Sequence, residues 1–570
     1  MKAILKYSLF FIILLGVCQA RLFAQGKPED VIFKALADEM KRSLTDLSLD
    51  KYKPPFFIAY QVSDGKALAI KATLGALNQT KEYPLRHLDI RLMVGDYALN
   101  DENFVSGFEA SAFGDADLPL PLQNDYSAIR KAIWVQTDGM YKSALDEYEQ
   151  KLTALKQQNK EENEKLDDYS RMIPVNLMLK EIPFTFNRAR WEEVAKDLSA
   201  VFKDYDRIFS SVVNIYFLNS NIYYLNSEGT RLRYPFNIAW VTIQATTQAE
   251  DGEPLKDQVR FYAPTADQLP PVEKIKQGVK KMAEDLTALR KAPVIEDAYN
   301  GPVIFEGEAV AELFLQKLFG SDGLIASREP IYAIGRQGKA PVNKFDNKLN
   351  QKICSADISI KATPKLKKAN NFSLVGSYEV DSEGVVPPDE CVLVDKGFLK
   401  TLLNDRVPTL KVKASNGHSR MSLGGVQKAP GVIQVSVANG KSNSDLKKDV
   451  LQEAAQNGLE YIYLVRKIEA ANTRRNLTLS KPVWVYKVSV KTGAEQLVRS
   501  TVISDFQINA FKQIVSGTTD QIVYNTLKNN SVPVSFIVPQ AIVINDVNLE
   551  KDPTTKPKLP VVPNPIAALH

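Results

Sequence analysis

Short segments in which apolar and polar residues alternate recur along much of this chain, and they constrain its fold more than any other feature. Between residues 212 and 255 such segments are separated at Asn219-Ser220-Asn221 and Ser227-Glu228-Gly229, which predicts a strand meander with glycine in a turn. Further strands, with few helices between them, are expected at 376–380, 391–394, 433–437, 461–468, 483–490 and 496–502. The C-terminal half is therefore predicted to form a closed or strongly curved, barrel-like antiparallel sheet.

The N-terminal half combines helix and strand patterns. Apolar residues recur on one face of a helix predicted over 28–49, and strands are expected at 56–62, 67–74 and 87–94, with a turn at Asp64-Gly65. The chain has 570 residues, more than the roughly 250–300 that one hydrophobic core supports. Together these patterns predict an α+β protein of two domains.

The predicted domains follow the proline-bounded helix at 270–289. An N-terminal α+β domain is expected over 25–295 and a β-rich domain over 296–550. The last segment, 551–570, contains five prolines and is predicted to form an extended strap.

Residues 1–24 have the pattern of a secretory signal peptide. Lys2 and Lys6 precede an apolar run from Tyr7 to Val17, which is shorter than the about 20 residues of a membrane-spanning helix. Cleavage after Ala24 predicts export, with the periplasm as the expected compartment; a lipid anchor at Cys18 is the alternative. Cleavage would leave 69 basic and 67 acidic residues, a balance that gives no electrostatic reason to expect nucleic-acid binding.

After that cleavage two cysteines remain, Cys354 and Cys391. An oxidising compartment would permit a disulfide between them, and two separately buried thiols are the other interpretation.

A long charged helix is predicted over 139–166. Its apolar residues Tyr141, Leu145, Tyr148, Leu152 and Leu155 follow heptad spacing, and Glu147–Lys151 and Glu161–Lys165 are favourable i,i+4 pairs for an exposed helix. Such a helix is either a protruding arm for dimer contact or a surface helix packed at one end.

Three segments of the C-terminal half resemble one known family. GPVIFEGEAVAELF (301–314), DSEGVVPPDECVLVDKGFLKTLL (381–403) and SNGHSR (415–420) are similar to the C-terminal half of the TldD/PmbA family, the modulators of DNA gyrase. FFIAYQV (56–62) and RLMVGDYALNDENF (91–104) resemble the N-terminal domain of an exported bacterial subgroup of this family, and the NSEGT hairpin (226–230) is similar to a hairpin of the family. The resemblance implies a metallopeptidase-related protein.

TldD-type members are zinc peptidases with a helical HExxxH motif, and this chain has AELFLQKLF (311–319) in its place. Phe314 and Leu318 stand near the ligand positions, which predicts a buried packing helix. The histidines left after cleavage, His87, His418 and His570, are far apart in sequence, and His87 is expected on the solvent face of a strand. No zinc set is therefore expected, and no other cofactor.

Carboxylates offer a second kind of metal site in this region. Glu306, Glu308 and Glu312 would suit a hard ion such as calcium or magnesium better than zinc. The alternative is a solvated acidic helix start, which the helix dipole favours.

SNGHSR provides the best remaining candidate site. Gly417 permits a sharp turn that presents His418 beside Asn416, and the Arg420 guanidinium could grip a carboxylate. With Asp381 and Glu383, expected on one strand face, these residues are candidates for peptide binding; the other interpretation is a loop that satisfies local polar groups.

The resulting hypothesis is an exported TldD/PmbA-like protein without the zinc motif. PmbA-type subunits also lack HExxxH and act as partners of the TldD type, so the resemblance implies a peptide-binding or partner subunit, in a homodimer or in a heterodimer with a TldD-type subunit. A peptidase with a non-standard site, which would need zinc, and a structural envelope protein that assembles through 141–166 are the alternatives. Whether the chain is an enzyme is left open by its sequence.

Overall fold

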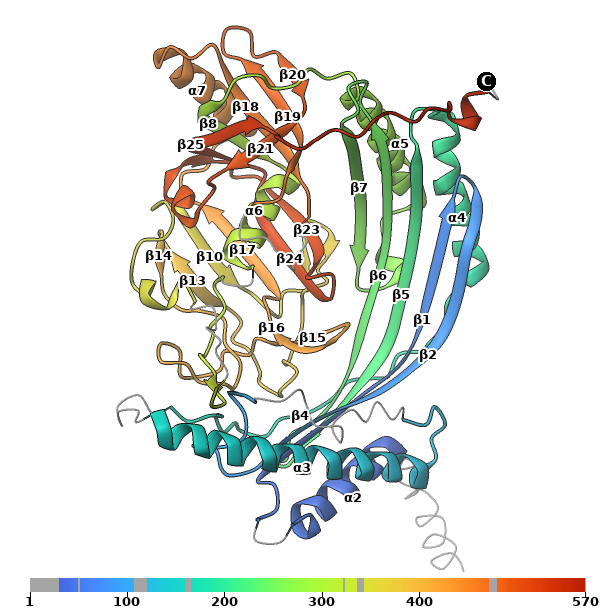
Figure 1. Cartoon of the computed structure of the whole chain (residues 1–570), viewed down its shortest axis with the longest axis vertical. Coiled ribbons are helices and arrows are strands. Elements are labelled where there is room, and N and C mark those ends of the chain that lie inside the picture. Colours follow the sequence, from blue (N-terminus) through green and yellow to red (C-terminus); the bar gives the residue numbers. More distant parts are fainter. Residues whose placement is uncertain are drawn as a thin grey trace, which may run out of the picture.

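A computed structural model of the chain describes residues 30–49, 52–106, 120–158, 166–320, 323–335, 343–470 and 479–568. Figure 1 shows a mixed α+β protein in which long curved N-terminal strands face a strand-rich C-terminal half. The predicted signal peptide, with Cys18, lies outside the described residues, as does His570. Among the helices that are described, none is long and apolar enough to cross a membrane.

The N-terminal sheet has the strand order β2-β1-β5-β6-β4, and β7 also pairs with β6. Its four longest strands, β2, β1, β5 and β6, contain 17 or 18 residues each and pair antiparallel with one another, whereas β4 is parallel to β6. The strand bounds are β1 Phe57–Thr73, β2 Ala76–Met93, β4 Asn176–Met178, β5 Ser210–Asn226, β6 Arg231–Gln248 and β7 Pro254–Ala263.

Two predicted interruptions of this sheet are wrong. The chain does not turn at Asp64-Gly65 or at 219–221, because β1 and β5 run straight through these positions and pair Gly65 with Ser220. A Cβ atom on Gly65 would lie 2.5 Å from the Asn219 carbonyl oxygen. The glycine therefore marks a close approach of two strands, whereas the turn predicted at 227–229 does join β5 to β6.

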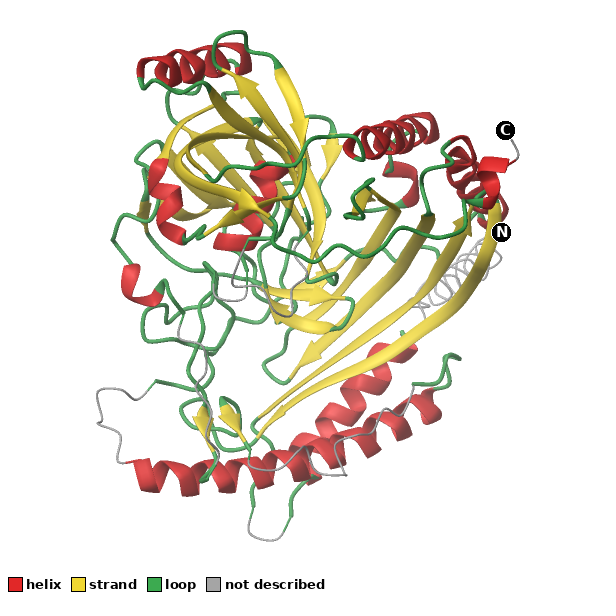
Figure 2. Ribbon diagram, turned by 45° about the horizontal axis from the view of Figure 1, so that its top comes forward, coloured by secondary structure: helices red, strands yellow, loops and turns green. Residues whose placement is uncertain are grey.

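Helices cover the ends and one face of this sheet (Figure 2). The helices α2 (Val31–Asp46) and α3 (Tyr126–Gln158) share an apolar core with β1 and β2. On the other part of the sheet, α4 (Arg188–Ala200) and α5 (Val272–Leu289) pack against β1, β5 and β6. Leu527 of the C-terminal half joins a separate cluster with Ala67, Leu218 and Ile238 of these strands.

The predicted charged helix corresponds to α3, which begins earlier than expected, at Tyr126. Tyr141 and Leu145 are buried in the core, so this part of α3 packs onto the sheet as a surface helix. The expected exposed pair of Glu147 with Lys151 is wrong, because Lys151 is buried. Its Nζ lies 2.5 Å from Asp168 Oδ2 and donates to the Asn100 carbonyl oxygen at 2.8 Å.

Two curled sheets form the C-terminal half and give it a half-barrel shape. One has the order β20-β19-β18-β8-β25-β21, with β22 on β25, and the other has the order β14-β13-β10-β17-β24-β23. Most pairs are antiparallel, but β8 with β18 and β17 with β24 are parallel. The bounds are β8 Tyr299–Glu306, β10 Ile358–Ala362, β13 Cys391–Asp395, β14 Phe398–Leu399, β17 Val432–Val437, β18 Tyr461–Ile468, β19 Pro482–Ser489, β20 Glu495–Val498, β21 Thr501–Ser504, β22 Ile514–Gly517, β23 Gln521–Lys528, β24 Val532–Pro539 and β25 Ala541–Lys551.

The predicted strand at 376–380 is a bent loop, and the one at 496–502 is split between β20 and β21 at Ser500, whose φ is 56°. Helix α6 (Glu308–Leu318) lies in the core of this half, and α7 (Asn443–Gln456) packs against β8 and β18. Cys354 and Cys391 are separate buried thiols. Beyond β25 the tail crosses to the N-terminal half, where Asn564 Nδ2 donates to the Asp206 carbonyl oxygen at 2.6 Å.

Gly65→Ala is expected to lower the free energy of unfolding by about 1–3 kcal/mol, because backbone atoms of β5 occupy the space of the added methyl group. Gly424→Ala is the matched control, since no described atom lies within 4 Å of the position of its Cβ. Chemical unfolding of both variants measures the effect. Equal stabilities would contradict the close approach of β1 and β5.

Candidate functional site

Asp381 fixes the loop on which the candidate site is built. Its buried carboxylate accepts hydrogen bonds from the backbone N–H groups of Glu383 at 2.9 Å, Val385 at 2.8 Å and Ser419 at 3.2 Å. The last bond ties the loop to β15 (Ser419–Ser422). Burial, with the nearby Glu383 charge, raises the pKa of Asp381. Asp381 therefore links its own loop, at residues 383 and 385, to β15 at Ser419.

Glu383 does not share a strand face with Asp381, contrary to the sequence prediction, because residues 381–384 form a turn. The Glu383 carboxylate forms an ion pair with Arg91 of β2 and accepts the backbone N–H of Arg406 at 3.0 Å. Burial raises the pKa of Glu383, and the Arg91 charge opposes this shift. Glu383 thus joins the two halves of the chain.

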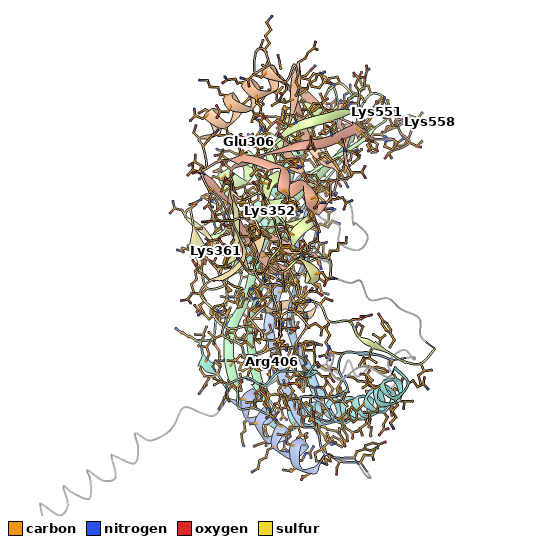
Figure 3. All side chains as sticks on the ribbon, turned by 90° about the vertical axis from the view of Figure 1, so that its left-hand side faces the viewer. Glu306, Lys352, Lys361, Arg406, Lys551 and Lys558 are labelled. Atoms are coloured by element: carbon orange, nitrogen blue, oxygen red, sulfur yellow. The ribbon has the colours of Figure 1, made fainter. Side chains whose placement is uncertain are left out.

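Arg406 is the residue that sequence reasoning missed. Its side chain is fully buried, and Figure 3 places it within the body of the molecule beside the N-terminal strands. The guanidinium lies 2.6 Å from Glu228 Oε1, donates through Nε to the Ser170 carbonyl oxygen at 3.0 Å, and lies 4.1 Å from the ring centre of Tyr169. No local pattern distinguishes Arg406 in the sequence, because its partners lie 178 and 236 residues away.

His418 and Asn416 contact each other in the loop that leads into β15. His418 Nδ1 lies 2.9 Å from both the carbonyl oxygen and Oδ1 of Asn416, so Nδ1 carries the proton and donates it. Nε2 is buried and has no hydrogen-bond partner among the described residues. Burial, aided by the Arg420 charge, lowers the pKa of His418 to about 3, so the imidazole is neutral at physiological pH.

Gly417 allows the loop to turn between Asn416 and His418. Its φ is 74°, and an added Cβ would lie 2.8 Å from the Cα of Pro387. The sharp turn predicted at Gly417 is therefore present.

Arg420 is buried, with 6% of its surface exposed, and differs from Arg406 in its partners. Its guanidinium carbon lies 3.7 Å from the ring centre of Tyr378. Within the described part of the chain no acceptor forms a hydrogen bond or an ion pair with it, and its Nε is buried without a partner. Burial lowers the pKa of Arg420, but an arginine side chain keeps its charge in proteins.

A cavity of about 410 Å³ adjoins Arg420 and Asp381 at the junction of the two halves. It is lined by Leu177, Tyr234 and Phe236 of the N-terminal sheet and by Tyr378 and Met421 of the C-terminal half, among others. Of the five residues predicted from the sequence, Asp381 and Arg420 line the cavity, whereas Glu383, Asn416 and His418 stand behind its wall.

Helix α6 does not fit a zinc ion. Phe314 and Leu318 are core residues, as expected, and none of the residues of α6 carries an imidazole or a thiolate. Glu312 is fully buried, which contradicts the solvated helix start expected from the sequence. It lies 3.4 Å from Arg260 and accepts hydrogen bonds from Tyr524 and from Gln316.

The other two carboxylates of this region are also paired with cations. Glu306 pairs with Arg466 at 2.8 Å, and Glu308 with Lys467 at 3.1 Å. Burial raises the pKa of Glu312, while Arg260 opposes the shift. His87 lies elsewhere, on β2, where its side chain is 64% exposed as predicted. The described residues contain no group of three or more potential ligands that could hold a metal ion.

Two family models match the chain. The model described as the PmbA/TldA metallopeptidase C-terminal domain matches residues 298–551, and the central-domain model of the same family matches residues 183–286. Together they cover more than half of the chain. No curated protein sequence matches the chain.

Three solved structures share the fold over most of their length. A candidate modulator of a DNA gyrase from Thermotoga maritima is 14% identical, with a TM-score of 0.56, 92% of this chain and 100% of that chain being covered. TldE from Thermococcus kodakarensis is 13% identical, with a TM-score of 0.54 and coverages of 90% and 99%. A candidate modulator of DNA gyrase from Bacteroides thetaiotaomicron is 14% identical, with a TM-score of 0.55 and coverages of 91% and 98%.

His418→Gln is expected to flatten the pH dependence of stability between about pH 6.5 and pH 3. In that window the unfolded chain binds a proton at His418 that the folded chain does not bind, so the stability of the wild type falls as the pH falls. The slope of the free energy of unfolding against pH should be smaller in the variant by up to about 1.4 kcal/mol per pH unit, which corresponds to one proton. Urea unfolding at pH 4 to 7 measures it, and identical slopes for both proteins would contradict a buried, neutral His418.

Proposed function

Because models of the PmbA/TldA metallopeptidase family match more than half of its length, the chain belongs to that family, and we propose that it is an exported, zinc-free member that binds peptides in the cavity beside Arg420. Its proposed role is that of a peptide-binding or partner subunit in proteolysis. The observation that carries this proposal is the buried Arg420 guanidinium, which faces a cavity without an acceptor from the described residues.

Burial of a charge without a partner costs several kcal/mol, and arginine cannot avoid this cost by losing its proton. A ligand with a carboxylate would supply the missing partner through charge-assisted hydrogen bonds. The cavity, at about 410 Å³, lies within the roughly 300–1,000 Å³ range of ligand sites and combines apolar walls with a few polar groups. Among ligands of this chemistry, a peptide agrees best with the metallopeptidase family.

The zinc-free part of the proposal rests on α6. Its carboxylates Glu312 and Glu308 form ion pairs with Arg260 and Lys467. A metal ion would have to displace these cations to bind the carboxylates. A family member without zinc would need another subunit to cleave the peptide. This supports a role beside a TldD-type subunit in a heterodimer. A homodimer that only binds peptides is the other possibility.

Export is proposed from the signal-like pattern of residues 1–24. Mass determination of the protein from the bacterial periplasm should give a chain that begins near Gln25, whereas a lipid-modified Cys18 would reveal an anchor instead.

The purified mature chain, incubated with zinc and dialysed, is expected to hold far less than one zinc per chain by elemental analysis. It should bind short unfolded peptides in fluorescence anisotropy without cleaving them. Stoichiometric zinc together with chelator-sensitive cleavage would contradict the zinc-free assignment and favour a peptidase with a non-standard site. Absence of binding by any peptide would contradict the peptide-binding role.

A further inference from the structure

One edge of β6 has a gap in its pairing beside Arg420. β5 pairs with one edge of β6 from residue 231 to residue 246. On the opposite edge, β4 pairs with 231–233 and β7 with 239–248. No strand in the described ranges pairs with residues 234–238 on that edge. Unpaired strand edges attract additional strands, and proteins normally cover them.

Backbone groups in this gap point toward the cavity side of β6. Arg233 accepts the N–H of Leu179 and Arg231 donates to Val175, so the odd-numbered residues face the β4 edge. By the alternation of antiparallel strands, the carbonyl group of Pro235 and both backbone groups of Asn237 face the same edge. The position of Pro235 agrees with this direction, because proline lacks the N–H that pairing with β5 would require.

The cavity beside Arg420 lies along this gap. Its lining includes Tyr234 to Asn237 of β6, with Leu177 and Leu179 at the β4 end and Pro264 at the β7 end. Residues of segment 373–382 and of β15 in the C-terminal half also line it, so Arg420 and the unpaired edge share one cavity. Five residues of strand span about 17 Å, enough for three to five residues of an added peptide.

We propose that this cavity takes the C-terminal end of an extended peptide, which adds to β6 along 234–238 and places its terminal carboxylate on Arg420. The inference rests on the proposed peptide-binding function and deepens it. Main-chain hydrogen bonds to the gap supply affinity for any sequence, as in other cases of strand addition, and the guanidinium supplies selection for a free carboxyl end.

Two observations favour an external C-terminus over other occupants. The chain's own tail is held elsewhere, since Asn564 binds Asp206, next to α4, and Lys556 pairs with Asp251. Asp381 lines the same cavity, and its carboxylate accepts backbone N–H groups on both oxygens but forms no hydrogen bond with Arg420, whose Nε has no partner among the described residues. Of the two lysines that line the cavity, Lys367 pairs at 2.6 Å with Glu379, which lines it too, and Lys368 adds one positive charge.

The experiment uses the full mature chain and fluorescent unfolded peptides of about six residues. Three peptides are compared: the first has a free C-terminus, the second has the same sequence with a C-terminal amide, and the third is the amide with its last residue replaced by glutamate. We expect the amide to bind about 10-fold or more weakly than the free acid, and the glutamate peptide not to recover the loss. If the glutamate peptide binds as tightly as the free acid, Arg420 recognises a side-chain carboxylate and not the terminal one, and the proposal is overturned.

The Arg420→Gln variant should bind the acid and the amide equally, whereas Arg188→Gln, a change on the exposed face of α4, should bind as the wild type does. If Arg420→Gln does not fold, the peptide series on the wild-type protein still decides the assignment. Strand addition is tested with N-methylated peptides. Methyl groups at one set of alternate positions should abolish binding and those at the other set should not, because only alternate N–H groups face a neighbouring strand.

The outcomes of these binding experiments distinguish failure of the inference from failure of the proposed function. Equal binding of acid and amide would overturn the role of the terminal carboxylate while leaving the proposed function in place. Equal effects of the two N-methylated series would overturn strand addition. Absence of binding by every peptide would overturn the proposed function and this inference together.

Discussion

The buried guanidinium of Arg406 is the contact on which the arrangement of the two halves depends. A charge in the interior must be paired, and breaking such a pair typically costs about 3–5 kcal/mol. Arg406 belongs to the C-terminal half, and its partners Glu228, Ser170 and Tyr169 belong to the N-terminal half. The same junction includes the ion pair of Glu383 with Arg91.

This junction positions the cavity. Glu383 binds Arg91 and the backbone of Arg406, which fixes the turn that follows Asp381. Asp381 then holds Ser419, the residue before Arg420. Arg406 and Arg420 are both buried, yet Arg406 forms an ion pair with Glu228 and hydrogen bonds to Ser170, with only its Nη1 unpartnered, whereas no acceptor among the described residues binds Arg420. Arg406 therefore has a structural role, whereas Arg420 can accept a ligand as its hydrogen-bond partner.

The sequence predicted more of the fold than of the site. Helix faces, the turn at 227–229 and the core character of α6 follow from local periodicity, which a single sequence displays. The glycine at position 65 was misinterpreted because its neighbour, Ser220, is 155 residues away, and a glycine at a close approach looks the same in sequence as one in a turn. Arg420 was identified from its loop, but the pairing gap of β6 depends on β4 and β7, whose registers only the folded chain defines.

A crystal structure of the mature chain, grown with a saturating unfolded peptide that has a free C-terminus, tests the proposed peptide site most directly. Peptide backbone should lie beside residues 234–238 of β6, between β4 and β7, with the terminal carboxylate within hydrogen-bond distance of Arg420. A peptide bound elsewhere, for example in the polar cavity beside Arg260 and Lys467, with the edge of β6 empty, would contradict it.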